Sequence, residues 1–220
     1  INMNLNNFTF NTTSGIRFGS GMSVSSSQEI CKILGSNILF ITDKDLMSLK
    51  LTEPTLNELK KFSSKVEIFE DVEADPSLKT LLNSIEIGKK MKATGVIGFG
   101  GGSSMDVAKL TSLILGSDEN IEEVWGVSNA KGPRLPLVLV PTTAGTGSEV
   151  TPISIITVGE EEKKGVSSPI ILPDVAILDP DLTIGLPAHT TAATGIDAMV
   201  HAIEGYASAN KNNNPISKML

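Results

Sequence analysis

Cysteine is nearly absent from this sequence. Cys31 is the only one among 220 residues, which excludes an internal disulfide framework and is typical of a reducing compartment. Because Cys31 lies among Ile30, Ile33 and Leu34, a buried structural thiol is favoured over a nucleophile.

Runs of basic residues and long apolar runs are absent as well. A net charge of −7 argues against a nucleic-acid-binding surface. No apolar run approaches the roughly 20 residues that span a membrane, and no signal peptide is visible. We therefore expect a cytoplasmic protein that binds neither nucleic acid nor membrane; the alternative is a processed form imported into an organelle. The composition, 40% hydrophobic and 20% charged, is ordinary for a globular protein.

Apolar runs and helical patterns alternate through much of the chain. Strands are predicted at 37–42, 66–69, 94–99 and 135–140. Helices are predicted at 23–34, 46–62 with a break near Pro54, 75–91 and 103–115. The strands are continuous runs of Val, Ile, Leu and Phe, which is typical of strands covered on both faces. The sequence therefore predicts an α/β fold with a doubly wound, mostly parallel sheet.

The two ends of the chain depart from this alternation. Apolar runs at 8–10 and 16–18 predict a hairpin at a sheet edge, and later β segments predict a hairpin-like excursion with an extra strand. These later segments are 153–158, 164–168 and 175–178. From Leu182 the pattern becomes helical. We expect residues 1–181 to form the α/β domain and 182–220 to begin an all-helical domain whose remainder lies beyond the last residue.

A glycine-rich turn joins the strand at 94–99 to the next helix. It reads Gly98-Phe-Gly-Gly-Gly-Ser103, which misses the dinucleotide-binding fingerprint by one residue because Ser103 replaces the last glycine. Glycines there let backbone amides approach a pyrophosphate, whose charge the helix N-terminus favours. The alternative is a turn that serves packing only, with Asp106 meeting the helix dipole and Lys109 on the surface.

The strand at 135–140 ends in a second suggestive loop, Pro141-Thr-Thr-Ala-Gly-Thr-Gly-Ser-Glu149. Hydroxyl residues interleaved with glycines supply hydrogen-bonding groups and little bulk, which suits a polyanionic or nicotinamide ligand. A plain polar loop is the alternative. Ligands of such sheets bind beyond the carboxyl ends of the strands, where both loops lie together with Asp43, which follows the strand at 37–42.

Asp197 and His201 are four residues apart in an alanine-rich stretch that follows Pro187. In a helix they share one face, and a carboxylate and an imidazole so placed are two ligands for a divalent metal. The alternative is that His201 packs or caps the helix while Asp197 faces water. The only other histidine, His189, is too far along the helix to bind the same metal as Asp197, so we expect it at the surface.

Four blocks in this order resemble the iron-containing (group III) alcohol dehydrogenase family. They are Gly-Gly-Gly-Ser-x-x-Asp-x-Ala-Lys at 100–109, Pro-Thr-Thr-Ala-Gly-Thr-Gly-Ser-Glu-Val-Thr at 141–151, Leu-Pro-Asp-Val-Ala-Ile-Leu-Asp-Pro at 172–180 and Ala-Ala-Thr-Gly-Ile-Asp-Ala-Met-Val-His-Ala-Ile-Glu at 192–204. Four blocks in register are far more specific than any one of them. The resemblance implies an N-terminal dinucleotide-binding domain and a helical C-terminal domain, with the active site between them.

The resemblance also implies which residues bind the cofactor. Asp43 would bond the ribose hydroxyls and repel a 2′-phosphate, which favours NAD over NADP; as a plain turn residue it would only cap the next helix. The pyrophosphate would lie on the glycine turn, and the threonine-rich loop would line the cleft. The implied residues are Asp43, Gly101, Gly102, Ser103, Asp106, Thr142, Thr143, Thr146 and Lys163, with Lys164 as an alternative to Lys163.

Asp197 and His201 match the first two of four metal ligands in the family, where two further histidines follow; here none follows His201. The implied metal is Fe²⁺ or Zn²⁺. The expected function is an NAD(P)- and metal-dependent oxidoreductase, a homo-oligomer that interconverts a small alcohol and its aldehyde or ketone by hydride transfer. The alternatives are a hydroxyacid-oxoacid transhydrogenase, a glycerol dehydrogenase-like enzyme on the same scaffold, or an inactive NAD-binding fragment without the full metal site.

Overall fold

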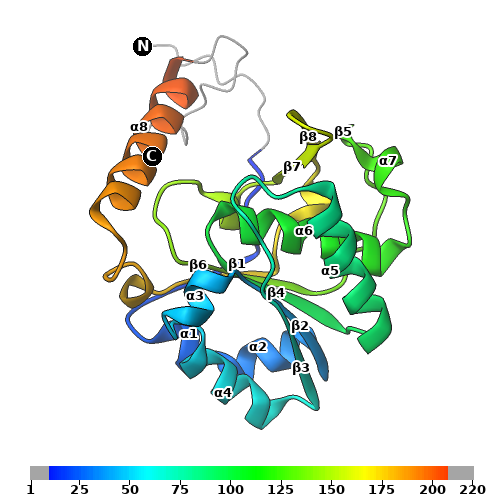
Figure 1. Cartoon of the computed structure of the whole chain (residues 1–220), viewed down its shortest axis with the longest axis vertical. Coiled ribbons are helices and arrows are strands. Elements are labelled where there is room, and N and C mark those ends of the chain that lie inside the picture. Colours follow the sequence, from blue (N-terminus) through cyan, green and yellow to red (C-terminus); the bar gives the residue numbers. More distant parts are fainter. Residues whose placement is uncertain (1–9, 208–220) are drawn as a thin grey trace, which may run out of the picture.

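A six-stranded parallel sheet lies at the centre of the molecule, in a computed structural model that describes residues 10–207 (Figure 1). The strand order is β1-β9-β6-β4-β2-β3. The strands are β1 (Gly15–Phe18), β2 (Asn37–Ile41), β3 (Lys65–Phe69), β4 (Gly95–Gly100), β6 (Leu137–Pro141) and β9 (Val175–Leu178). When β2, β3, β4, β6 and β9 are numbered 1 to 5 in chain order, their order across the sheet is 2-1-3-4-5, that of a doubly wound sheet. Strand β1 is added at the edge beside β9. The predicted fold class is confirmed.

Helices cover both faces of this sheet (Figure 1). They are α1 (Met22–Ser25), α2 (Ser27–Leu34), α3 (Lys44–Ser48) and α4 (Glu53–Phe62) on one face, and α5 (Leu78–Met91) and α6 (Gly102–Ser117) on the other. Ile38 and Phe40 of β2 pack in the cluster with α2 and α4, whereas Leu39 and Ile41 pack in the cluster with α5 and α6. Because successive residues meet different helix layers, both must be apolar, which explains the continuous runs.

A second, three-stranded sheet lies beyond α6. It consists of β5 (Gly126–Val127), β8 (Glu162–Ser167) and β7 (Ile153–Val158), with β7 and β8 forming the predicted hairpin; α7 (Ile121–Val124) precedes β5. The prediction that 175–178 belongs to this excursion is wrong. That segment is β9, which inserts between β6 and β1 in the main sheet because Val175, Ala176 and Ile177 are apolar and bury there.

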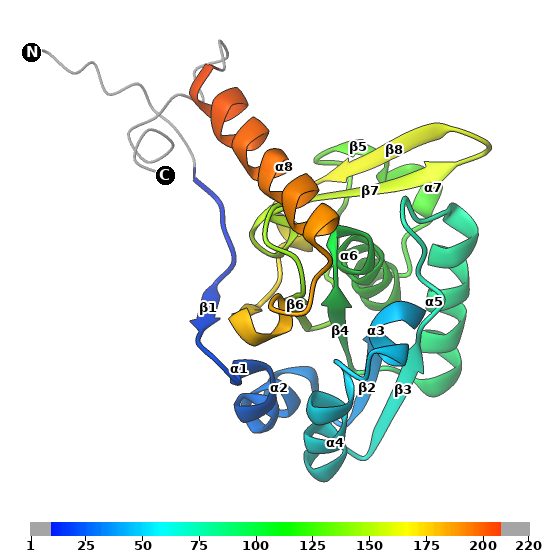
Figure 2. The same ribbon diagram turned by 60° about the vertical axis from the view of Figure 1, so that its left-hand side comes forward.

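The edge strand β1 pairs in parallel with β9, from Gly15 opposite Val175 to Phe18 opposite Leu178. The predicted hairpin partner, 8–10, lies outside the described residues except for Phe10, which is in no strand. At the other end, the 3₁₀ turn η3 (Pro180–Leu182) contains the predicted domain boundary, and α8 (Ala188–Ala207) then rises away from the sheet (Figure 2). Between residues 10 and 207, no helix has both the length and the apolar character needed to cross a bilayer.

Candidate functional site

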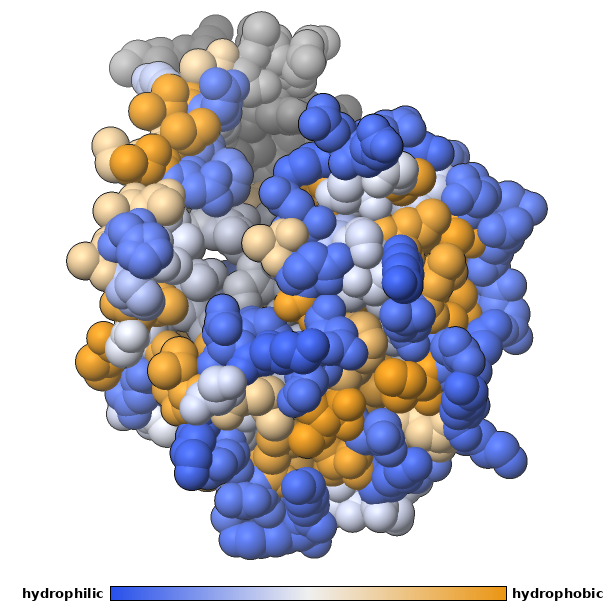
Figure 3. Space-filling model, in the orientation of Figure 1, coloured by the Kyte–Doolittle hydropathy of each residue, from blue (hydrophilic) through white to orange (hydrophobic). Residues whose placement is uncertain are grey.

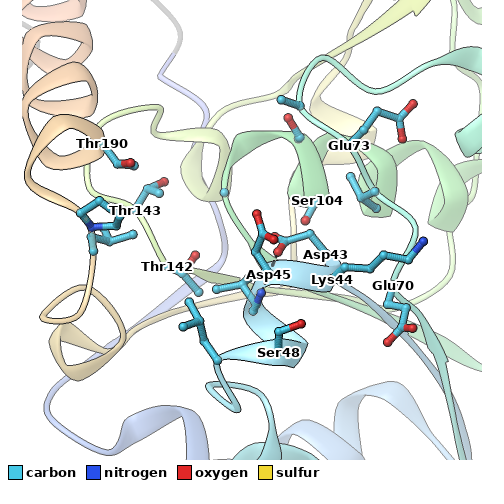
Figure 4. Close-up of a pocket in the computed structure, with 18 of the residues that line it drawn as sticks. Asp43, Lys44, Asp45, Ser48, Glu70, Glu73, Ser104, Thr142, Thr143 and Thr190 are labelled. Carbon is cyan, nitrogen blue, oxygen red and sulfur yellow. Dashed lines mark hydrogen bonds between the residues drawn. The ribbon is translucent and has the colours of Figure 1, made fainter.

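An open cleft of about 840 Å³ lies at the carboxyl ends of the parallel strands (Figure 4). The chain runs from β2 outward to β3 and then returns to β4 on the other side of β2, so this edge holds the topological switch point. Doubly wound sheets bind ligands there because the loops on either side diverge. The cleft is lined by Asp43–Leu46, Ser48, Leu49, Glu70–Ala74, Gly101, Ser103, Ser104, Thr142, Thr143, Leu186, Pro187, His189 and Thr190.

The glycine turn brings the N-terminus of α6 to this cleft. A Cβ on Gly98 would lie 2.7 Å from the Cβ of Ala108, so glycine is what lets α6 pack directly on β4. Gly101 precedes the first helical residue and carries no capping side chain. The first N–H groups of a helix have no intrahelical acceptor and carry the positive end of its dipole. The turn therefore presents donors suited to an anion, and Gly101 and Ser103 both line the cleft.

Two threonines from the loop after β6 face the same space (Figure 4). Thr142 is 2% exposed, and the Oγ1 of Thr143 is buried without a hydrogen-bond partner among residues 10–207. A buried hydroxyl is normally satisfied, so Thr143 is a candidate donor or acceptor for a bound ligand. Thr146 does not line the cleft; its Cγ2 lies 3.2 Å from where a Cβ of Gly102 would be, so it packs on the glycine turn.

Asp43 directly follows β2 and caps α3. Its Oδ1 accepts a hydrogen bond of 2.9 Å from the N–H of Leu46, so the capping role considered for it is observed. The same side chain lines the cleft. Burial, and then the charge of Asp45, raises the pKa of Asp43 above its ordinary value. The carboxyl thus lies where the sequence places it, at the carboxyl end of β2 and beside the glycine turn.

The alternative that placed Lys109 on the surface is wrong, because its side chain is fully buried. Its Nζ donates to the Oγ of Ser148 at 2.8 Å and to the carbonyl of Ile153 at 2.7 Å. The nearest carboxylate oxygen of Asp106 is 3.8 Å away. Burial lowers the pKa of Lys109 to about 8 and raises the pKa of Asp106. A lysine is buried in this way only when polar partners compensate for its lost hydration.

Asp106 also points away from the cleft. Its Oδ1 accepts from the Oγ of Ser148 at 2.7 Å, and its Oδ2 accepts from the N–H of Ile155 at 2.9 Å. Gly102, Asp106, Thr146 and Lys163 are the predicted cofactor residues that do not line the cleft. Lys163 lies on β8, where its ammonium pairs with Asp75 at 2.6 Å. Their contact with a cofactor stays a prediction.

Asp197 and His201 share one face of α8, as their spacing predicts. The Nε2 of His201 lies 3.6 Å from the Oδ1 of Asp197, and the side chains are 56% and 43% exposed respectively. Within the described range, no group of three or more His, Cys, Asp or Glu side chains is arranged to hold a metal. The pair therefore offers two ligands, and its role as a metal site stays a prediction.

Sequence reasoning missed two walls of the cleft. Glu70–Ala74 follows β3, and the rule used for Asp43, that ligands meet the carboxyl ends of strands, points to it equally. Leu186–Thr190 opens α8, and His189, which we expected at the surface, is exposed there but lines the cleft. The signal was its place at the predicted junction of two domains, where clefts commonly form.

Comparison with known proteins identifies the family. The family model described as iron-containing alcohol dehydrogenase matches residues 13–180. The chain belongs to the iron-containing alcohol dehydrogenase family. Among curated members, it is 38% identical over 185 residues to long-chain-alcohol dehydrogenase 1 of Geobacillus thermodenitrificans, a match that covers 83% of this chain and 47% of that protein.

Solved structures of the family agree with this fold. An alcohol dehydrogenase from Oenococcus oeni superimposes with a TM-score of 0.90 at 34% identity, covering 97% of this chain and 56% of that one. The sulfoacetaldehyde reductase of Bifidobacterium kashiwanohense, solved in complex with NAD⁺, gives a TM-score of 0.81 at 32% identity, covering 90% and 53%. The chain spans about half the length of the curated relatives it matches.

Proposed function

We propose that the cleft binds NAD, and that the whole protein is a metal-dependent dehydrogenase that interconverts a small alcohol and its aldehyde or ketone. The observation that carries the proposal is the convergence at one switch point of three groups: the open N-terminus of α6, the unpartnered hydroxyl of Thr143 and the carboxyl of Asp43. A pyrophosphate, its neighbouring oxygens and a ribose require groups of these three kinds. The family relative solved with NAD⁺ supports the choice of ligand.

The proposed cofactor contacts follow the cleft from end to end. Asp43 would accept hydrogen bonds from the adenosine ribose hydroxyls, and its charge would oppose the 2′-phosphate of NADP. The backbone of Gly101, Gly102 and Ser103 would hold the pyrophosphate. Thr142, Thr143 and Thr146 would border the remainder of the cofactor, and Lys163 would approach it from the β7–β8 hairpin.

The proposed metal is Fe²⁺ or Zn²⁺, held in part by Asp197 and His201. An imidazole and a carboxylate suit both ions, and one helical turn places the two side chains together. Catalytic ions of this kind take three or more protein ligands, so the remaining ligands would come from outside the described residues. When bound, the nicotinamide would accept the hydride and the metal would polarise the alcohol oxygen.

The residues of this chain would contribute orientation rather than acid–base chemistry. Asp43 and the glycine turn would fix the two halves of the dinucleotide. Gly145 lets the threonine-rich loop approach α8 closely, since a Cβ added to Gly145 would lie 2.2 Å from the carbonyl oxygen of Thr194. Thr194 is three residues before Asp197, so this contact and Asp197 share one face of α8. Fixed geometry of this kind is what hydride transfer requires. The domain boundary at 181/182, a homo-oligomeric state and a cytoplasmic location stay predictions.

Calorimetric titration of the 220-residue chain tests the proposal in two steps. NAD is titrated first, with NADP as the matched comparison, and Fe²⁺ or Zn²⁺ is titrated second. We expect one NAD site with clear preference over NADP. We also expect weak metal uptake, because this chain supplies two of the three or more ligands, and we expect it to disappear in His201→Asn. Absence of NAD binding contradicts the proposal. NAD binding without any metal uptake contradicts the metal role of Asp197 and His201 and favours a non-enzymatic NAD-binding module. In the whole protein, NAD that stays bound through turnover would favour a transhydrogenase.

A further inference from the structure

The buried pair Lys109 and Asp106 is the strongest polar feature that the proposed chemistry does not use. Both residues lie in the first two turns of α6, directly after the glycine turn, but neither lines the cleft. All four of their side-chain hydrogen bonds go to the segment 148–155. This segment immediately follows the threonine loop, defined here as residues 142–147.

The pair holds the far end of the threonine loop at three points. Ser148 is bound from both sides, since its Oγ donates to Asp106 at 2.7 Å and accepts from Lys109 at 2.8 Å. Lys109 also binds the carbonyl of Ile153, and Asp106 binds the N–H of Ile155. The near end of the loop is held by the sheet, where the N–H of Thr142 donates to the carbonyl of Gly100 at 3.0 Å.

Between these two ends the loop makes its functional contacts. It carries Thr142 and Thr143 on the cleft wall, and Gly145 packs it closely on α8. A loop containing Gly145 and Gly147 has many accessible conformations, so its shape depends on how its ends are fixed. We propose that Lys109 and Asp106 are positioning residues that hold the threonine loop against the cofactor cleft, acting through Ser148 rather than by contact with the cofactor.

Burial strengthens this assignment. Lys109 is fully buried, so a charged or polar partner is worth more there than on the surface, and removal of one partner leaves the others without compensation. Among residues 10–207, only Ser148 forms hydrogen bonds with both charged side chains, so we assign it as the residue through which they act on the loop. Lys109, Asp106 and Ser148 do not line the cleft, and the side-chain hydrogen bonds of the two charged residues all go to the segment that follows the loop.

The test compares ligands that use different parts of the cleft, and its NAD arm depends on the proposed function. The full chain is titrated with NAD and with AMP, whose adenosine would lie at the Asp43 end. Ser148→Ala and the charge-balanced double variant Asp106→Asn/Lys109→Met are each expected to weaken NAD about tenfold and AMP less than about twofold. Adding Ser148→Ala to the double variant is expected to change NAD affinity no further, since all three residues act through one contact.

The matched control is Ser84→Ala. Ser84 lies in α5, and its buried hydroxyl is 2.6 Å from the Oγ1 of Thr111 in α6. Neither residue belongs to the threonine loop. Ser84→Ala is expected to lower stability while NAD affinity stays within about twofold. Equal losses of NAD and AMP affinity in Ser148→Ala, or normal NAD affinity in it, would overturn the inference.

A second readout needs no ligand and separates this inference from the proposed function. Amide hydrogen exchange of the free chain is expected to rise in residues 142–147 in Ser148→Ala and in the double variant, and to stay unchanged there in Ser84→Ala. Unchanged exchange in all three variants overturns the inference even if NAD binds. Faster exchange confined to 142–147 supports it even if NAD does not bind, in which case only the proposed function fails.

Discussion

The two helices that carry the proposed chemistry, α6 and α8, differ in how they are held. α6 buries ten of its 16 residues, whereas α8, in the part of the chain that the structure describes, buries none of its 20. An apolar stripe of α8 at helical spacing, Ile196, Met199, Val200 and Ile203, is exposed, and Figure 3 shows hydrophobic surface along this helix. The N-terminus of α6 is therefore fixed by packing, whereas the Asp197–His201 pair is not.

This difference in packing explains why the cleft beside α6 has a fixed shape, whereas α8 supplies only two metal-ligand candidates. Packing around α6 orients the glycine turn, and Lys109 binds Ser148 directly after the threonine loop, so the proposed cofactor cleft is preorganised. On α8 the side chains of the two metal-ligand candidates are about half exposed, His201 by 56% and Asp197 by 43%.

Matched truncations of the two helices should differ most. Leu110→Ala in α6 removes a fully buried side chain and should lower the free energy of unfolding by about 2–5 kcal/mol. Ile203→Ala in α8 removes one that is 60% exposed and should change it by about 0.5 kcal/mol or less. Urea unfolding of both variants measures the difference. Similar losses would mean that α8 is covered in solution.

The buried lysine should give the chain an unusual dependence of stability on pH. The pKa of Lys109 falls from 10.5 to about 8 on folding because of burial, so between these values the unfolded chain binds more protons. The contribution of Lys109 to the free energy of unfolding therefore rises as pH rises from about 8 to about 10.5, by on the order of 3 kcal/mol in all.

Lys109→Met removes this titration. Urea unfolding of the wild type and the variant across that pH range gives the difference in their free energies of unfolding. This difference should shift in favour of the wild type as pH rises. A difference that is constant or shifts the other way would show that Lys109 does not titrate as its burial requires.

Asp43 can be separated into its two roles by two substitutions. Asp43→Ser keeps an N-cap for α3 and removes the charge, so stability should change by about 0.5 kcal/mol or less while the preference for NAD over NADP falls. Asp43→Ala also removes the cap and should cost about 1 kcal/mol. Titrations with both cofactors measure the preference, and one that survives in Asp43→Ser would exclude Asp43 as its source.

The metal-ligand candidates should have the smallest effect on the fold. His201→Asn and Asp197→Asn alter exposed side chains, so the free energy of unfolding and NAD affinity of the metal-free chain should stay within about 0.5 kcal/mol of the wild type. Metal uptake should fall in both. A large loss of stability in either variant would favour the alternative that His201 packs or caps the helix.

The sequence predicts well those features that depend on neighbours along the chain. Continuous apolar runs identify β2, β4 and β6 because strands covered on both faces need apolar residues at successive positions. The turn at Gly101 and the cap at Asp43 follow directly from the ends of strands. Asp197 and His201 share a face because a helix turn brings residues four apart together.

Features that depend on distant partners could not be predicted. Lys109 resembles any helical lysine, and its burial depends on Ser148 and Ile153, which the fold brings to it from 39 and 44 residues away. The assignment of 175–178 to the main sheet depends on pairing with β1, far earlier in the chain. His189 faces the cleft only because α8 begins beside the threonine loop.

We propose that this chain presents a preformed NAD cleft at the switch point of its sheet. Amide hydrogen exchange with and without saturating NAD tests it most directly. We predict that NAD slows exchange at 43–46, 101–104 and 142–147 and leaves exchange in the second half of α8 unchanged. No protection at these loops, or protection confined to the small sheet of β5, β7 and β8, would contradict it.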